Sequence, residues 1–155
     1  MEYALVKVIH ILSSTLLFGT GLGSAYYKWM ADRSGDISTI ASTNRIVVLA
    51  DWMFTTPTVI IQPLSGFWLV KILGYPLDQL WIVLTIGLYL IAGCCWLPVV
   101  WLQIRMRDLA AEANNLNQEL PRQYHRYARI WFWLGVPAFI AMTIVFGLMV
   151  FKPTI

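Results

Sequence analysis

The chain has 155 residues, of which 59% are hydrophobic and 14% aromatic, while only 12% are charged. Soluble domains are about half apolar and about a quarter charged, so this balance excludes an ordinary soluble protein and predicts an integral membrane protein. The formal charge of +3 comes from basic residues beside the apolar runs, where lipid headgroups and topology account for them. We therefore expect the lipid bilayer as a partner and no nucleic acid.

Four long apolar runs predict membrane-spanning helices at about residues 4–27, 46–72, 80–104 and 130–151. Too little chain lies between them for a soluble domain, so we predict one all-α domain over residues 1–155, a four-helix transmembrane bundle. Prolines in the second, third and fourth runs predict that these helices are kinked: Pro57, Pro63, Pro98 and Pro137. In the second run, the carbonyl groups that the prolines free need polar partners.

Polar segments separate the runs. Residues 28–44 contain charged and turn-forming residues and predict a solvated link, and residues 74–78 predict a short turn. Residues 105–129 are polar, but apolar residues recur there at near-helical spacing, at positions 109, 110, 113, 116 and 120. This pattern predicts a short amphipathic helix beside the membrane, with a plain solvated loop as the alternative.

The distribution of basic residues predicts the orientation. Most of them lie in or beside the first and third links: Lys28, Arg33, Arg45, Arg105, Arg107, Arg122, Arg126 and Arg129. The positive-inside rule places these links in the cytoplasm and both termini outside. For a bacterial protein, this means a multi-pass protein of the inner (plasma) membrane with periplasmic termini.

His10 is the exceptional residue of the first run, because no Asp, Glu, Lys or Arg occurs between Val8 and Ala25. An ionisable group inside a membrane is costly and by default suggests function. At helical spacing, small residues such as Gly21 and Ser24 share its face and leave room for a bulky group. Alternatively, a neighbouring helix packs closely on this face and His10 hydrogen-bonds across the interface.

Small residues also recur at the depth of His10 in the other spans. His10 lies about five residues, or roughly 7 Å, from the middle of its span towards the outside. At the same level we find Ser65 and Gly66 in the second span, Gly87 in the third and Gly147 in the fourth. A flat macrocycle needs such clearance, and a neutral imidazole is a good axial ligand of haem iron. The sequence thus predicts haem b bound at His10, with Gly66 and Gly87 beside it.

Other residues near this level have two interpretations each. Lys7, Lys71 and Lys152 lie near the outer interface, where they would either neutralise haem propionates or extend to lipid headgroups. Met142 and Met149 are candidates for a second axial ligand of the haem iron. Alternatively, the second position on the iron is open and the two methionines only pack in the bundle.

Three further groups carry weaker hypotheses. His125 lies in a basic, aromatic stretch that suits headgroup contact. Asp51 is expected to form an ion-pair cluster with Arg45, Arg105 or Arg107, and a proton path extended by Gln62 and Gln103 is the alternative. The adjacent Cys94 and Cys95 offer soft ligands for copper.

Long motifs give the chain a family resemblance. Residues 45–57 (RIVVLADWMFTTP), 62–66 (QPLSG), 96–108 (WLPVVWLQIRMRD) and 148–153 (LMVFKP) resemble a bacterial family of predicted integral membrane proteins of unknown function. More distantly, residues 7–10 (KVIH) and 66–70 (GFWLV) are similar to the copper-resistance-protein-D-like membrane proteins and the HemJ-type protoporphyrinogen oxidases.

The HemJ-type resemblance implies a four-helix haem protein in which His10 is the ligand. That family has a lysine early in its third span, whereas this chain reads LWIVLTIG at residues 80–87, so we do not expect protoporphyrinogen oxidation.

Together, these patterns predict a haem-b-binding integral membrane protein that acts in electron transfer or in a membrane-linked oxidation, as a haem-dependent oxidoreductase with a membrane redox partner. The alternatives are copper transport or homeostasis, and an accessory subunit of a larger membrane complex. A homo-oligomer is a further possibility.

Overall fold

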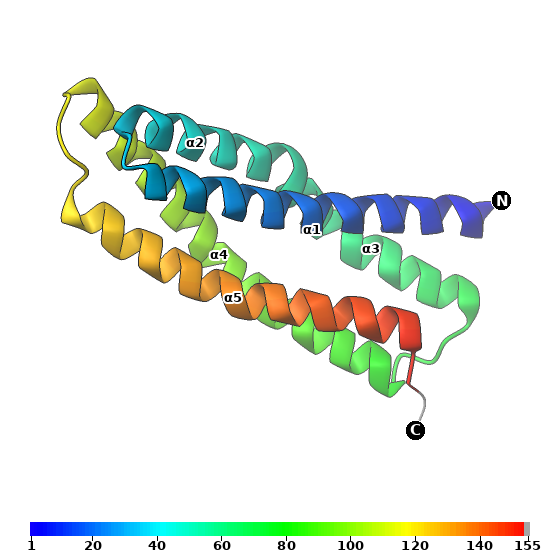
Figure 1. Cartoon of the computed structure of the whole chain (residues 1–155). Coiled ribbons are helices and arrows are strands. Elements are labelled where there is room, and N and C mark those ends of the chain that lie inside the picture. Colours follow the sequence, from blue (N-terminus) through cyan, green and yellow to red (C-terminus); the bar gives the residue numbers. More distant parts are fainter. Residues whose placement is uncertain (154–155) are drawn as a thin grey trace.

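The computed structural model describes residues 1–153, and its regular structure is entirely helical (Figure 1). The elements are α1 (Glu2–Ser34), α2 (Ile37–Ala50), the π-helical segment η1 (Asp51–Thr55), α3 (Thr56–Leu73), α4 (Leu80–Asn115) and α5 (Arg122–Phe151). Because α2, η1 and α3 follow one another without a break, residues 1–153 contain four helices long and apolar enough to cross a membrane. The predicted all-α, four-span architecture is confirmed.

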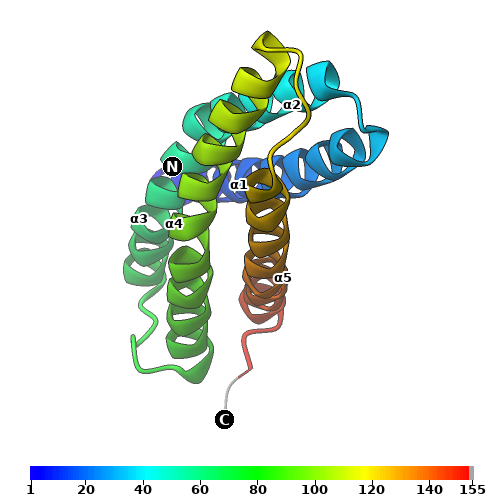
Figure 2. The ribbon, with the colours of Figure 1, turned by 90° about the vertical axis from the view of Figure 1, so that its left-hand side faces the viewer.

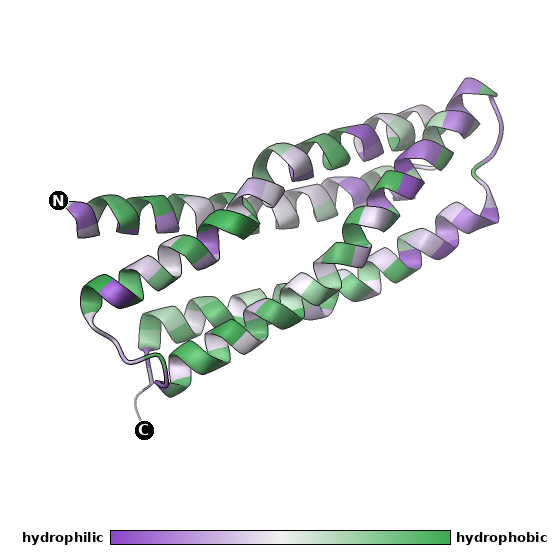
Figure 3. Cartoon of the chain, turned by 180° about the vertical axis from the view of Figure 1, so that it is seen from behind, coloured by the Kyte–Doolittle hydropathy of each residue, from purple (hydrophilic) through white to green (hydrophobic). Residues whose placement is uncertain are grey.

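Both termini lie at one end of the bundle, together with the turn between α3 and α4 (Figure 1). The other end holds the link between α1 and α2 and the link between α4 and α5. Hydrophilic residues gather at this second end, whereas apolar residues dominate the helices elsewhere (Figure 3). We call the two ends the terminus side and the link side.

The four spans pack as two pairs that diverge towards the terminus side. The most extensive helix contact joins α4 to α5, and α1 packs on α3, while α2 joins the pairs by packing on α4 (Figure 1). In Figure 2, α5 lies beside α4 and away from α3. The bundle is therefore closed on the link side and open between the pairs on the terminus side.

The hydrophobic core correspondingly lies on the link side. Its members come from all four spans: Ala31, Ile40, Val99, Leu102, Met106, Ala110, Tyr124 and Trp131. Met106 and Ala110 belong to the polar segment predicted as an amphipathic helix at the membrane surface. That prediction is wrong in one respect: the helix is a continuation of α4 to Asn115, and it buries Ala110 and Ala113 within the bundle.

The first link is much shorter than the solvated segment 28–44 that the sequence predicted. α1 continues to Ser34 and α2 begins at Ile37, so only Gly35 and Asp36 connect them. Gly35 has φ 70°, a left-handed conformation that favours glycine and ends α1. The side chain of Asp36 caps α2 by accepting a hydrogen bond from the Thr39 amide, and the hydroxyl and amide of Thr39 together hold the pKa of Asp36 below its ordinary value.

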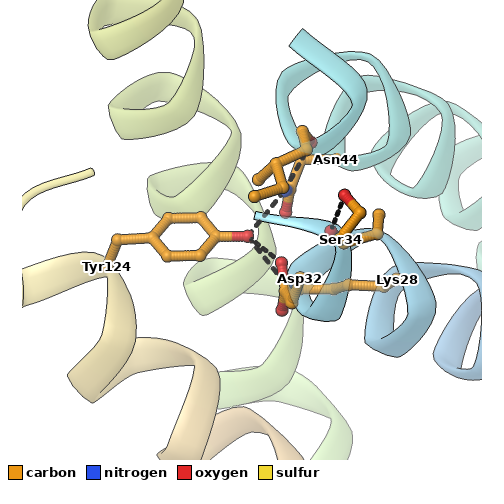
Figure 4. Close-up of polar contacts among 7 residues, drawn as sticks. Lys28, Asp32, Ser34, Asn44 and Tyr124 are labelled. Atoms are coloured by element: carbon orange, nitrogen blue, oxygen red, sulfur yellow. Dashed lines mark hydrogen bonds and ion pairs between the residues drawn. The ribbon is translucent and has the colours of Figure 1, made fainter. Parts of the chain in front are cut away.

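Lys28 shows why the prediction of a solvated link was wrong, because its side chain is fully buried. Its Nζ donates to Asp32 Oδ2 at 2.7 Å and to the Tyr124 hydroxyl at 3.0 Å (Figure 4). Tyr124 in turn donates to Asp32 and accepts a 2.8 Å hydrogen bond from the buried Asn44 amide. The rings of Tyr124 and Trp131 lie 5.0 and 5.3 Å from Nζ. This cluster satisfies the buried cation and joins α1, α2 and α5.

Prolines lie inside three of the spans without ending them. Pro63 is within α3, Pro98 within α4 and Pro137 within α5. The carbonyl of Val59, which Pro63 leaves without its usual donor, accepts a 2.6 Å hydrogen bond from the Tyr89 hydroxyl. The need for a polar partner is thus confirmed at this carbonyl, while the predicted kinks stay predictions.

Candidate functional site

A cavity of about 600 Å³ lies between the two helix pairs on the terminus side. Side chains from all four spans line it, including Lys7, His10, Gly66, Tyr89 and Met142, so we call it the His10 cavity. Its volume lies within the range of about 300–1,000 Å³ that is usual for small-molecule and cofactor sites. The divergence of the helix pairs provides this space.

His10 is held in one orientation by Ser65 on α3. Its Nδ1 lies 2.8 Å from Ser65 Oγ, and that hydroxyl already donates to the Ile61 carbonyl at 2.6 Å. A hydroxyl has a single proton to donate, and the short contact with the Ile61 carbonyl favours its use there, which makes Ser65 the acceptor and assigns the imidazole proton to Nδ1. In this tautomer Nε2 retains its lone pair, and it has no hydrogen-bond partner among residues 1–153.

A second contact fixes the backbone of His10. The Gln62 side-chain amide donates to the His10 carbonyl at 2.8 Å and also to the Ser13 hydroxyl. Ser13 donates to the same carbonyl at 3.1 Å. Gln62 and Ser13 are both buried, so the imidazole is attached to a rigid junction between α1 and α3.

Gly66 lies directly against the imidazole. A Cβ at this position would be 3.4 Å from His10 Cε1, an ordinary van der Waals contact, so a larger side chain here would meet the ring. Lys7 lines the same cavity one turn from His10, and its Nζ lies 5.4 Å from the centre of the Tyr3 ring. The structure thus brings together three of the four predicted cofactor-site residues.

Gly87, the fourth, is exposed on α4 and does not line the cavity. Depth along a span fixes the level of a residue but leaves open the direction in which it faces about the helix axis. At the same level of α4, Thr85 and Tyr89 line the cavity in its place. The Thr85 hydroxyl is buried and has no partner among the described residues.

Of the remaining candidates on this side, Met142, Met149 and Lys152 line the cavity, whereas Lys71 is exposed outside it. Lys152 Nζ lies 3.4 Å from the Tyr75 hydroxyl. The two methionines come from α5, across the cavity from the α1–α3 pair.

A buried polar stripe on η1 and α3 was missed as a unit by sequence reasoning. Its members recur at alternating steps of four and three residues, and all are buried: Asp51, Thr55, Thr58, Gln62 and Ser65. This spacing keeps them on one helix face, so the signal was present in the sequence as a polar face within an apolar run. The stripe continues from the His10 contacts towards the link side.

The predicted ion-pair cluster at Asp51 is wrong. Asp51 is buried and accepts a 2.8 Å hydrogen bond from Thr55, and no Lys or Arg of residues 1–153 pairs with it. Arg107 instead pairs with its neighbour Asp108 at 2.7 Å. Asp51 is the first residue of the π-helical segment, and its side chain is only 5% exposed.

The other two candidates lie away from His10. His125 is exposed at the link side. Cys94 is exposed and Cys95 half-buried on α4, and neither lines the His10 cavity. Within residues 1–153, no three His, Cys, Asp or Glu side chains are grouped to hold a metal ion.

Comparisons with known proteins identify a family. No curated protein and no solved structure matches the chain. Residues 4–153 match the family of predicted integral membrane proteins designated DUF2269, which agrees with the four spans described above. Because the match extends over almost the whole chain, this protein belongs to the DUF2269 family of predicted integral membrane proteins.

Proposed function

We propose that the protein binds haem b in the His10 cavity and acts in electron transfer or in a membrane-linked oxidation. The observation that carries the proposal is the hydrogen bond between His10 Nδ1 and Ser65, which leaves Nε2 free to bind a metal. Histidines that ligate metals commonly donate their other ring N–H in this way, which fixes the tautomer and the ring orientation.

The residues of the cavity fit a haem. Its walls are largely apolar, and at Gly66 no side chain occupies the space beside the imidazole. Lys7 and Lys152 supply positive charge from opposite helix pairs, as two propionates require. The unpaired Thr85 hydroxyl is a donor that a bound group would satisfy.

The choice of a tetrapyrrole follows from the ligand set. Within residues 1–153, no group of three His, Cys, Asp or Glu side chains could hold a metal, so a metal bound to His10 needs ligands from elsewhere. A macrocycle brings four nitrogen ligands of its own. Met142 and Met149, which also line the cavity, would be the candidates for a further ligand. When bound, haem would supply one-electron transfer between its ferrous and ferric states.

The proposed orientation places this cavity near the outer face of a bacterial inner membrane, with periplasmic termini. The structure puts both termini and the His10 cavity at the end opposite the two basic links, and the positive-inside rule supports a cytoplasmic position for those links (Figure 1).

An absorption spectrum of the purified protein tests the proposal. We expect a Soret band that shifts on reduction with dithionite in protein from cells supplied with a haem precursor. His10→Ala should lose the band, because it removes the ligand. His125→Ala, which changes the exposed histidine at the link side, should keep it. A folded, colourless wild-type protein would overturn the proposal.

A further inference from the structure

A second cavity, of about 350 Å³, lies on the link side of the His10 cavity. We call it the Trp131 cavity. It is formed by α1, η1, α3, α4 and α5, and its walls are mostly apolar and aromatic, with Phe18 stacked on Phe139 at a centroid distance of 4.8 Å. Tyr89 and Met142 line both cavities and so mark the wall between them. His10 does not line this second cavity.

Three unpaired polar atoms distinguish the Trp131 cavity. Trp96 Nε1, Trp131 Nε1 and Gln103 Oε1 are buried without a hydrogen-bond partner among residues 1–153, and all three side chains line this cavity. Trp131 is only 8% exposed and Gln103 only 4%. Buried indole N–H and amide oxygen groups are nearly always paired, so atoms of this kind around one space indicate a missing partner.

Asp51 adds an acceptor to the same space. Its carboxyl group lines the cavity, has the side chains of Thr55 and Gln103 as its hydrogen-bond donors, and pairs with no Lys or Arg of residues 1–153. The cavity thus presents two N–H donors from Trp96 and Trp131 and two acceptors from Gln103 and Asp51.

We propose that the Trp131 cavity binds the head group of a membrane-soluble quinone or hydroquinone. The apolar, aromatic walls suit a flat ring, and the small residues Gly21, Ala25, Gly93 and Gly135 leave space for it. In the quinone, the ring carbonyl oxygens would accept hydrogen bonds from the two indole N–H groups. In the hydroquinone, the ring hydroxyls would donate hydrogen bonds to Gln103 and Asp51. The cavity is not enclosed, so an isoprenoid or alkyl tail can leave it towards the lipid.

This proposal stands apart from haem binding, because it uses none of the residues that hold His10. The test therefore measures binding rather than turnover, in the full-length protein reconstituted in lipid nanodiscs. The probe is decylubiquinone, titrated by calorimetry, with decylbenzene as a matched apolar compound that lacks the ring oxygens. We expect saturable binding of the quinone and none of decylbenzene.

Variants then locate the site. Trp131→Phe and Trp96→Phe should each weaken quinone binding about tenfold, because each removes one hydrogen-bond donor while an aromatic ring remains. Trp133→Phe is the control: this tryptophan is on the same helix as Trp131, but it is 66% exposed and lines neither cavity. Since Trp131 also contacts Lys28, Trp96→Phe tests the site without disturbing that contact.

His10→Ala separates the two proposals. Quinone binding should persist in this variant even where the haem spectrum is lost, and it should also persist if the wild type carries no haem. Equal binding of quinone and decylbenzene would overturn the proposal. An absence of saturable quinone binding would overturn it as well, because the cavity would then hold only water or acyl chains. Unchanged affinity in both Trp131→Phe and Trp96→Phe would overturn it too.

Discussion

The Tyr89 hydroxyl donates a 2.6 Å hydrogen bond to the Val59 carbonyl, four residues before Pro63. Pro63 has no N–H to offer this carbonyl, so a side chain of α4 replaces the missing backbone donor of α3. Direct packing between α3 and α4 is otherwise slight, because α3 pairs with α1 and α4 with α5. The bond therefore fixes the spacing of the two pairs at the wall between the cavities.

We predict that Tyr89→Phe lowers the free energy of unfolding by about 1–3 kcal/mol, because the half-buried Val59 carbonyl loses its donor while the ring is kept. Thermal unfolding in detergent measures the effect. Tyr26→Phe, at an exposed position on α1, is the control and should leave the midpoint unchanged. Equal midpoints for Tyr89→Phe and the wild type would show that the bond contributes nothing.

The two glycines predicted for the cofactor site differ in their surroundings, and this difference gives a second prediction. A large side chain at position 66 must displace the His10 ring, since a Cβ alone would already be 3.4 Å from Cε1. At Gly87 nothing lies within 4 Å of an added Cβ. Gly66→Leu should therefore abolish or strongly alter the haem spectrum, while Gly87→Leu should retain it.

Gly66→Ala completes this series. Its Cβ would make an ordinary van der Waals contact with the imidazole, so the spectrum should persist with at most a small shift. Helix propensity favours Ala and Leu over Gly at both positions, so loss of helix does not explain a failure at position 66. If Gly87→Leu and Gly66→Leu lost the spectrum equally, the position of the haem beside His10 would be wrong.

The sequence predicted the four spans and which residues of different spans lie at the same depth in the membrane. It did not predict whether most of these residues face the bundle interior or its outside. Apolar runs of membrane-spanning length fix the number of helices, and aligning their midpoints brought Ser65 and Gly66 to the level of His10, where the structure places them. The same alignment failed for Gly87, because rotation about the helix axis depends on how the helices pack.

Partners distant in the chain were equally hard to predict. Lys28 looked like a solvated link residue because a lone lysine is costly when buried. Its burial depends on Asp32, Tyr124 and Trp131, and Tyr124 and Trp131 lie about a hundred positions further along the chain. The Tyr89 bond to Val59 is of the same kind. The polar stripe from Asp51 to Ser65 was also missed as a unit, although its spacing alone carried the signal.

The Lys28 cluster gives a third prediction. Tyr124→Phe removes the hydroxyl that contacts Lys28, Asp32 and Asn44 but keeps the ring beside the Lys28 ammonium group. We expect a loss of about 1–3 kcal/mol in the free energy of unfolding, because the buried Lys28 and Asn44 side chains each lose a partner. Thermal unfolding measures the change.

Tyr127→Phe is the matched control for this substitution. It lies on the same helix, and its hydroxyl accepts a hydrogen bond only from the exposed Gln123 side chain among the described residues. Its unfolding midpoint should stay near that of the wild type. Similar midpoints for the two variants would mean that the Lys28 cluster adds no stability beyond ring packing.

The last prediction concerns the orientation in the membrane, which decides the side from which the His10 cavity is reached. Cys94 and Cys95 are first replaced by Ser, and single cysteines are then introduced as Asp78→Cys in the turn before α4 and as Gln118→Cys in the link before α5. Both positions are exposed, and they lie at opposite ends of the bundle (Figure 1).

A membrane-impermeant maleimide applied to intact cells should label Asp78→Cys, whereas Gln118→Cys should react only after the membrane is permeabilised. The physical reason is that eight of the eleven Lys and Arg residues fall within residues 28–45 and 105–129, the two segments that contain the links, and such residues are retained in the cytoplasm. The cysteine-free protein controls for background labelling. The reverse pattern would place both termini, and with them the His10 cavity, on the cytoplasmic side, so that a redox partner of this site would have to approach from there.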